Sequence, residues 1–269
     1  MNEKKTEPQN SQKKKIDVKK TLRNIIVLAL VAVISIVGTL AYLSTLSNQE
    51  TNTFEGSKGI KVQLDEPNFD KEEAKKYTPG MPIPKNPILT NVSTDDTSAT
   101  EWVAILVTYK YGMTDKTTYG NIKKIIEEIV YNDQTHVNSV PASSAAITSE
   151  DYWQLIDPNS NEDTSKYVIY MYCRTLANRD STTIALFDRV KIKGETELRT
   201  DSDIYNSITN QLTLPNFEIK VQGAAIKNEY FQDGTTTPAT KYSQLSTTDQ
   251  NQLKEDLIEV FTNNSLIPS

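Results

Sequence analysis

The chain has 269 residues, 37% hydrophobic and 24% charged, so it can bury the core of one large domain or two small ones. Its nine glycines exclude a collagen-like or glycine-rich disordered polymer. The first 41 residues hold eight basic and three acidic side chains, which leaves 21 basic and 32 acidic residues downstream. This downstream balance of −11 repels phosphate backbones and argues against nucleic-acid binding.

A membrane-targeting segment lies near the N-terminus. Residues 25–43 form an uncharged run of nineteen, IIVLALVAVISIVGTLAYL, directly after Lys19, Lys20 and Arg23. The length of this run fits either a signal peptide or a retained membrane anchor. In both cases the positive-inside rule keeps the basic head, residues 1–24, on the cytoplasmic side.

Small side chains at the end of this run favour cleavage over retention. The run changes at Gly38, and Thr39 and Ala41 stand three and one residues before the bond between Ala41 and Tyr42. Signal peptidases need small side chains at those two positions. We therefore expect a signal peptide over residues 1–41, with its apolar part at 25–41, and a secreted or cell-surface protein that touches the membrane only through this segment.

Hydrophobic alternation downstream predicts a mainly β domain. The expected strands are 60–64, 102–109, 167–176, 183–192 and 217–226. Residues 102–109, WVAILVTY, are almost continuously apolar, which is typical of a central strand covered on both faces. Four prolines within residues 79–87 predict an extended connector along a sheet edge.

Helical patterns interrupt these strands. Expected helices are one or two turns at 70–76, an amphipathic helix at 121–130, a short helix at 202–210 and a C-terminal helix that starts at Ser246 with a capping box and buries Leu253, Leu257, Val260 and Phe261. Residues 132–150 and 234–240 are expected to be loops. Together these elements predict a jelly-roll-like β-sandwich over residues 59–269 with inserted and C-terminal helices, preceded by a polar arm at 42–58.

The single cysteine, Cys173, excludes an intrachain disulfide and zinc sites built on two or more thiolates. Strand alternation places it on the same face as Tyr167, Ile169 and Met171. A buried core residue is therefore favoured over a reactive thiol.

Catalytic and metal-binding chemistry has little support. The single histidine, His136, lies in a polar stretch without an HExxH motif, so we expect neither a zinc protease nor a serine hydrolase, and no enzyme. The side chains of Asp157, Asn159, Asn161 and Asp163 alternate as at the start of a calcium loop. Glu162 and Val168 stand where that loop needs glycine and glutamate, so a solvated turn is favoured and no cofactor is expected.

Several motifs, taken in order, resemble one known family. They are GTLAYLS at 38–44, NTF at 52–54 before GIKVQL at 59–64, Pro79-Gly80 before Lys85, WVAILV at 102–107, LFDRVKI at 186–192 and FEIKVQGAAI at 217–226. The sequence resembles the TasA, camelysin and BsaA group of Gram-positive matrix proteins. That resemblance covers residues 38 to 226 and implies a jelly-roll subunit of extracellular biofilm fibres, cleavage after Ala41 by a SipW-type signal peptidase, and accessory matrix proteins as further partners. Camelysin has been described as a metalloprotease, but the matching positions here supply no zinc ligands.

The arm suggests how such a subunit would polymerise. Once freed, residues 42–54 are long enough to add a strand to the edge of a neighbouring sheet, with Tyr42, Leu43, Leu46 and Phe54 as its apolar side chains. Head-to-tail addition does not close and makes a filament. A flexible or self-docked N-terminus is the alternative for this segment.

A cell-surface adhesin or glycan-binding module is the second functional hypothesis. Trp102, Trp153 and the thirteen tyrosines would line a sugar-binding groove if they were exposed. Aromatic residues in strands are more often core residues or cross-strand partners.

Overall fold

The computed structural model describes residues 52–55, 60–93, 100–112, 118–130, 136–137, 151–156, 164–177 and 181–267, all within the compact unit Leu40–Ser269. The predicted signal segment, the first part of the arm and the calcium candidates Asp157, Asn159, Asn161 and Asp163 lie outside the described residues. Within the described ranges, no helix is long and apolar enough to cross a membrane.

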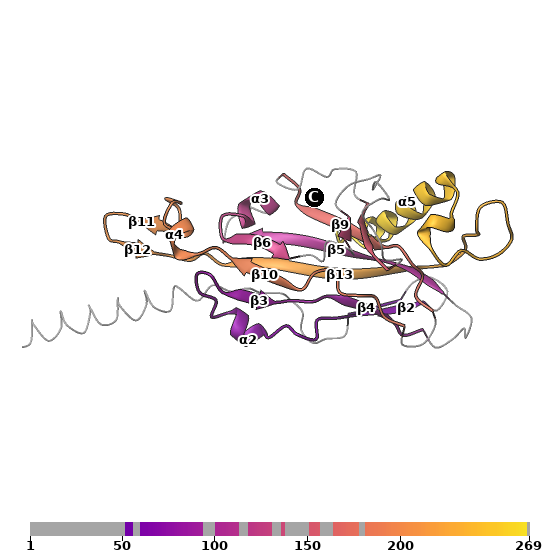
Figure 1. Ribbon diagram of the computed structural model, residues 1–269, viewed down its shortest axis with the longest axis horizontal. Coiled ribbons are helices and arrows are strands. Elements are labelled where there is room, and N and C mark those ends of the chain that lie inside the picture. The colour runs from indigo at the N-terminus through magenta and orange to yellow at the C-terminus, as the bar shows by residue number, and fades with distance from the viewer. Residues whose placement is uncertain are drawn as a thin grey trace, which may run out of the picture. The chain divides into compact units, whose positions relative to one another are not determined.

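The described unit is mainly β, and most of its strands pair antiparallel (Figure 1). The largest sheet has the order β13 (Phe217–Lys227), β5 (Glu101–Tyr111), β9 (Tyr167–Tyr172), β8 (Trp153–Leu155) and β7 (His136–Val137), of which only β7 and β8 run parallel. A second sheet has the order β1 (Asn52–Glu55), β2 (Lys61–Asp65) and β4 (Ile88–Asn91), and a third the order β3 (Pro82–Pro84), β10 (Arg189–Ile192) and β6 (Ile126–Val130). β11 (Tyr205–Asn206) and β12 (Gln211–Leu212) form a separate hairpin.

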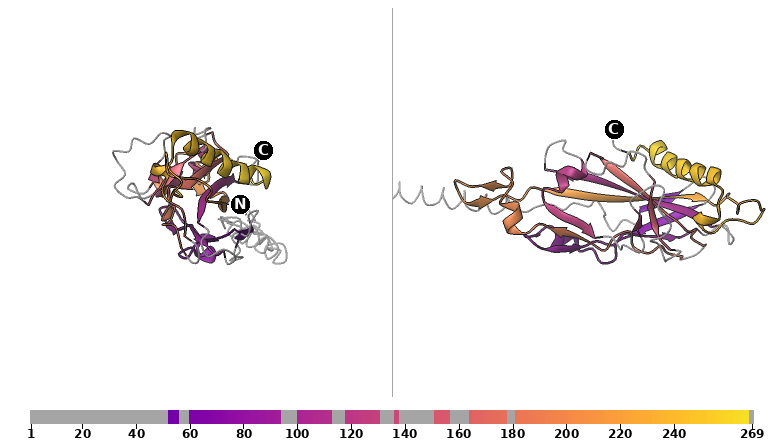
Figure 2. Two further views of the ribbon diagram at one scale, coloured as in Figure 1. Left: turned by 90° about the vertical axis from the view of Figure 1, so that its right-hand side faces the viewer. Right: turned by 45° about the horizontal axis from the view of Figure 1, so that its top comes forward.

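Two hydrophobic clusters sandwich the large sheet, because successive side chains of a strand point to opposite faces. On one face, Val103, Ile105 and Val107 of β5 pack with apolar residues of the two three-stranded sheets. On the other face, residues including Trp102, Ala104 and Leu106 pack with the C-terminal helix α5 (Thr247–Asn263). The views in Figures 1 and 2 agree, with α5 on one side of β5 and β13 and the strands β2, β3 and β4 on the other.

The prediction of a central, doubly covered strand at 102–109 is confirmed. β5 pairs with β13 along its whole length and with β9 along its middle, and the side chains from Glu101 to Val107 are all buried. The prediction that the proline-rich segment lies at an edge is also confirmed, since β3 is the outer strand of its sheet. Proline cannot donate a ladder hydrogen bond, so an edge position suits it.

Helix-end chemistry explains the two helices whose positions were predicted well. In α2 (Lys71–Ala74), the Asp70 carboxylate caps the first turn by accepting from the N–H groups of Glu72 and Glu73, at 2.8 and 3.0 Å. In α5, the Ser246 hydroxyl accepts from the Asp249 N–H at 3.1 Å, as the predicted capping box requires. The apolar stripe of α5 is buried as predicted at Leu253, Leu257 and Phe261, whereas Val260 is only half-buried.

The predicted amphipathic helix at 121–130 is wrong. One short helix, α3 (Tyr119–Ile122), is followed by turn residues 123–125 and then by the strand β6. Isoleucine and valine, which dominate this stretch, are stiff β-branched residues that fit a strand better than a helix.

A β-bulge in β6 explains why the pattern looked helical. Glu128 lies opposite Lys191 of β10, but the next paired residue of β6 is Ile126, so Glu127 is an extra residue. The bulge brings Ile126 and Ile129, three residues apart, to the same buried side. Spacing by three is what a helix also produces, and the sequence pattern alone does not separate the two.

The predicted short helix at 202–210 is also wrong. This segment contains β11 and the tip of the β11–β12 hairpin, where the Asn206 side chain accepts from the N–H groups of Ile208 and Thr209. Asn210 has a positive φ of 54°, which ends the turn. The expected strand at 183–192 begins only at Arg189, the strand at 167–176 ends at Tyr172, and β7 lies within the stretch 132–150 that was expected to be loop.

Candidate assembly interface

Part of the predicted arm, residues 52–55, forms a strand in the chain itself. β1 pairs antiparallel with β2, with Asn52 opposite Leu64, Phe54 opposite Val62 and Glu55 opposite Lys61. β1 is the outer strand of its sheet, so it joins an edge that β2 presents. Of the predicted arm residues, Phe54 therefore lies in a self-docked strand, whereas Tyr42, Leu43 and Leu46 lie outside the described residues, as do Thr39 and Ala41.

The strand that β1 joins, β2, is held in place by the core and by its pairing with β4. Val62 and Leu64 are buried while Lys61, Gln63 and Asp65 are half-buried, so one face of β2 belongs to the core. On its other side β2 pairs with β4, where Val62 faces Asn91 and Asp65 faces Ile88. The edge that receives β1 is thus anchored to the core and has a fixed register.

The described strands leave several sheet edges of unequal length. The outermost strands are β1 and β4, β3 and β6, and β13 and β7. β3 contains two prolines and β7 has only two residues, so both are poor templates for another strand. β13, with eleven residues, is the longest edge strand and lies next to β1 and β2.

A buried polar cluster lies where β2, β4 and β5 come together. Ser93 accepts the Lys61 N–H at 2.8 Å and donates its hydroxyl to Glu101 Oε1, and the Ser93 N–H is bound by Asn91 Oδ1 at 2.9 Å. Asn91, Ser93 and Glu101 are all buried. The cluster fixes the first residue of β2, and hence the strand on which β1 pairs.

The carboxyl group of Glu101 is chemically the most unusual member of this cluster. Its Oε2 atom is buried and has no hydrogen-bond partner among the described residues. Burial raises the pKa of Glu101 to about 7, although the hydrogen bonds from Ser93 and the Lys61 backbone act in the opposite direction. The protonation state of Glu101 therefore changes near neutral pH.

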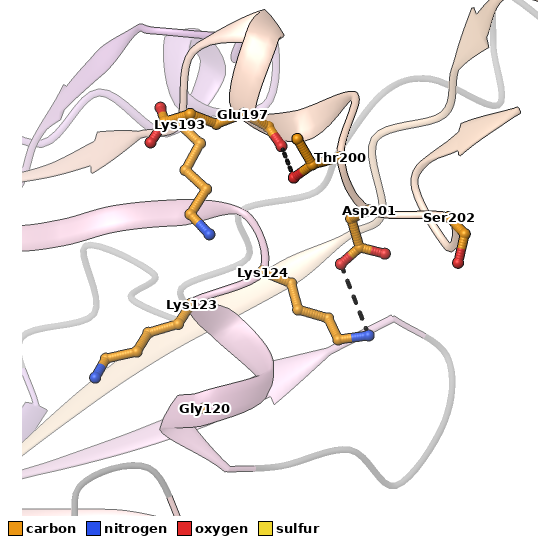
Figure 3. Close-up of a pocket in the computed structure, with 8 residues that line it drawn as sticks. All are labelled: Gly120, Lys123, Lys124, Lys193, Glu197, Thr200, Asp201 and Ser202. Atoms are coloured by element: carbon orange, nitrogen blue, oxygen red, sulfur yellow. Dashed lines mark hydrogen bonds and ion pairs between the residues drawn. The ribbon is translucent and has the colours of Figure 1, made fainter. Parts of the chain in front are cut away.

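An open, polar hollow of about 390 Å³ lies beside α3 and α4 (Glu195–Leu198). Figure 3 shows the side chains that line it. Its lining residues are Gly120, Lys123, Lys124, Lys193, Glu197, Thr200, Asp201 and Ser202. Lys124 Nζ lies 2.7 Å from Asp203 Oδ2 and 3.8 Å from Asp201 Oδ2, and Lys123 Nζ lies 5.0 Å from the centre of the Tyr119 ring. With three lysines against two carboxylates in the lining, the hollow has no strong charge preference.

The structure places the other predicted site residues apart from this interface. Cys173 is buried on the same face as Ile169 and Met171, which confirms its predicted position in the core. The backbone of His136 lies in β7, at the far edge of the large sheet. No group of three or more side chains able to hold a metal ion occurs in the part of the chain that is described.

Both tryptophans are core residues. Trp102 and Trp153 are fully buried, and their indole N–H groups donate to Asn228 Oδ1 at 2.9 Å and to the Ile184 carbonyl at 3.1 Å. Neither therefore lines an open sugar-binding surface.

The sequence reasoning missed the cluster of Asn91, Ser93 and Glu101. One signal was present, because Glu101 is a charged residue directly before the apolar run that forms the central strand. A carboxylate at such a position is buried with the strand and needs partners. Nothing in the sequence identified Ser93 as that partner, since the contact depends on how β4 packs.

Compared with models of known families, with curated proteins and with solved structures, the chain matches none.

Proposed function

We propose that this protein is an exported structural subunit of the TasA, camelysin and BsaA type that polymerises into extracellular matrix fibres, and that it is not an enzyme. Its signal segment, residues 1–41, is removed by a SipW-type signal peptidase or retained as an anchor through residues 25–43. Its partners are further copies of itself and accessory matrix proteins. The motifs quoted above, in their order along residues 38 to 226, are the reason for this assignment.

One observation supports strand addition as the mechanism of assembly. Residues 52–55, within the predicted arm, form a strand on the outer edge of a three-stranded sheet. β1 can make the same backbone hydrogen bonds to the β2 edge of another copy. In that arrangement the residues between β1 and β2 connect one molecule to the next, and repeated addition makes a filament. The edge of β2 would therefore pair either with β1 of the same chain or with β1 of another copy.

The finer fold that we propose is a jelly-roll-like β-sandwich. The large sheet packs one face against the two three-stranded sheets through a common hydrophobic cluster, as two layers of a sandwich do. Its helical decorations are α2, α3, α4 and α5. The proposed domain covers residues 59–269, with residues 42–58 as the arm.

Electron microscopy of the cleaved protein, which begins at Tyr42, tests this function. We expect fibres from the intact mature chain and none after deletion of residues 42–54. Asn52→Pro and Thr53→Pro are finer variants, because alternate residues of an antiparallel strand donate to the partner strand and one of the two prolines must remove such a bond. Thr53→Val is the control, since it keeps a β-branched residue at the same place.

The outcomes separate the parts of the proposal. If the intact mature chain remains monomeric under all conditions that support fibre growth of other matrix proteins, the fibre function is wrong. If fibres form equally well without residues 42–54, the subunit polymerises by another surface. Binding on a glycan array without fibres would favour the adhesin hypothesis instead.

A further inference from the structure

A lysine and a glutamate form an enclosed pair between the end of β2 and the end of β3. Lys85 Nζ lies 2.5 Å from Glu66 Oε1, and the two side chains are 0% and 5% exposed. Glu66 directly follows β2, and Lys85 directly follows β3. The ammonium group also lies over the ring of Phe69, 4.6 Å from its centre.

This pair is poorly solvated for two opposite charges. Glu66 Oε2 is buried and has no hydrogen-bond partner among the described residues. Burial lowers the pKa of Lys85, against the opposing effects of Glu66 and Glu218, so the neutral amine is more accessible than for an ordinary lysine. Burying two charges is costly even when they are paired, because the lost hydration exceeds much of their attraction.

Two exposed lysine–glutamate pairs of the same chain can be compared with this enclosed pair. Lys75 Nζ and Glu72 Oε1 are also 2.5 Å apart, but their side chains are 26% and 73% exposed. Lys191 and Glu127 form a third pair at 2.7 Å, with side chains about 40% exposed. Both of these pairs are open to solvent, so their charged groups keep hydration that the enclosed pair has lost. Enclosure, and not distance, distinguishes Lys85 and Glu66.

We propose that Lys85 and Glu66 condense to an intramolecular amide, which makes this enclosed pair a covalent cross-link in the mature protein. A proton first passes from the ammonium group to the carboxylate, giving an amine and a carboxylic acid. The lone pair of Lys85 Nζ then forms a bond to Glu66 Cδ, and one Cδ–O bond breaks. The leaving oxygen departs as water with one proton from the acid and one from the amine. No oxidant, reductant or other reactant is needed.

The fold supplies what this reaction needs. The two groups are held in contact, so the reaction is intramolecular and needs no encounter. The surrounding side chains exclude bulk water, which would otherwise hydrolyse the amide and hydrate the charged reactants. The product replaces two buried charges with one neutral amide. The new bond would covalently link the residue after β2 to the residue after β3. The segment that it closes into a loop contains α2.

Mass spectrometry of the full chain, as produced and fully denatured, tests the cross-link directly. We expect a mass 18 Da below that calculated for the residues that the purified chain contains, with or without residues 1–41. After trypsin digestion we expect the peptide of residues 62–71 to be joined to that of residues 77–110, because trypsin does not cleave after an amidated Lys85. The comparison pair must behave differently, with normal cleavage after Lys75.

Variants locate the bond. Lys85→Met and Glu66→Ala should each restore the mass calculated from the variant sequence, whereas Lys75→Met should keep the 18 Da deficit. The wild-type measurement needs no variant to fold. A wild-type mass equal to that calculated for the residues present, with separate peptides 62–71 and 77–85, would overturn the proposal and leave an ordinary buried ion pair. A deficit that maps to any other peptide would overturn it as well.

Discussion

Leu89 of β4 fills the space that a side chain on Gly223 of β13 would occupy. A Cβ atom at Gly223 would stand 2.5 Å from Leu89 Cδ2, and Leu89 is completely buried. The glycine thus permits the second sheet to approach the large sheet closely at the middle of β13. Gly223 also lies opposite Ile105 of the central strand. This contact positions β2 and β4, and with them the edge on which β1 pairs.

Gly223→Ala is expected to destabilise the domain. Its methyl group would overlap with Leu89, and overpacking of a well-packed core typically costs about 1–3 kcal/mol of unfolding free energy. Denaturant unfolding followed by circular dichroism measures the change.

The double variant Gly223→Ala with Leu89→Ala checks the cause. Leu89→Ala alone leaves a cavity and is expected to cost about 2–5 kcal/mol. If the contact is as described, the two substitutions together cost less than the sum of their separate effects, because the added methyl group fills part of the cavity. Additive costs would mean that the alanine at 223 acts through something other than Leu89.

Glu101→Gln is expected to change how stability depends on pH. Below pH 4.5 the carboxyl group is protonated in both the folded and the unfolded chain. As the pH rises from 4.5 to about 7, the unfolded chain loses this proton while the folded chain keeps it, so the free energy of unfolding falls. Above about 7 the loss is complete. Its size is on the order of 3 kcal/mol.

The glutamine variant removes this titration and keeps a neutral side chain of similar shape. Thermal or urea unfolding at pH 4.5, 6 and 8 should therefore show a smaller decline than in the wild type. Glu255→Gln, which removes an exposed carboxylate on α5, controls for the change in net charge. Equal declines in wild type and Glu101→Gln would show that Glu101 does not retain its proton in the folded state.

Cys173 is expected to be unreactive in the folded protein. It is 1% exposed, and burial raises the pKa of its thiol, so the nucleophilic thiolate is scarce. Because the chain has one cysteine, a thiol reagent gives an unambiguous count. We expect no labelling at pH 8 in buffer and one thiol per chain in 6 M guanidinium chloride. Rapid labelling of the folded chain would contradict this burial.

Ser246→Ala is expected to weaken the docking helix α5. The serine hydroxyl caps the first turn by accepting from the Asp249 N–H, and it also donates to Asp249 Oδ2 at 2.9 Å. Removal of such a cap typically costs about 1 kcal/mol. Ser246→Thr keeps the hydroxyl and should stay close to wild type in the same thermal unfolding experiment. Equal losses in both variants would assign the effect to packing and not to the cap.

Some elements could be predicted from local sequence because their signals are local. The continuous apolar run of β5 determined a doubly covered strand, and the Ser246 cap with its stripe of Leu253, Leu257 and Phe261 determined α5. Proline at residues 82 and 84 restricted β3 to an edge. In each case the residue type or the hydrophobic period is compatible with only one local structure.

Other features depend on tertiary contacts, which local sequence patterns do not specify. The isoleucines of β6 have a spacing that suits both a helix and a bulged strand, and pairing with β10 selected the strand. Lys85 and Glu66 are separated by nineteen residues, and Glu101 meets Ser93 only because β4 lies against β5. Local periodicity specifies which side chains are to be buried, but which partners they meet depends on contacts between distant parts of the chain. Local sequence patterns therefore predicted a mainly β domain with a C-terminal helix, whereas the packing of the sheets brought its buried polar groups into contact.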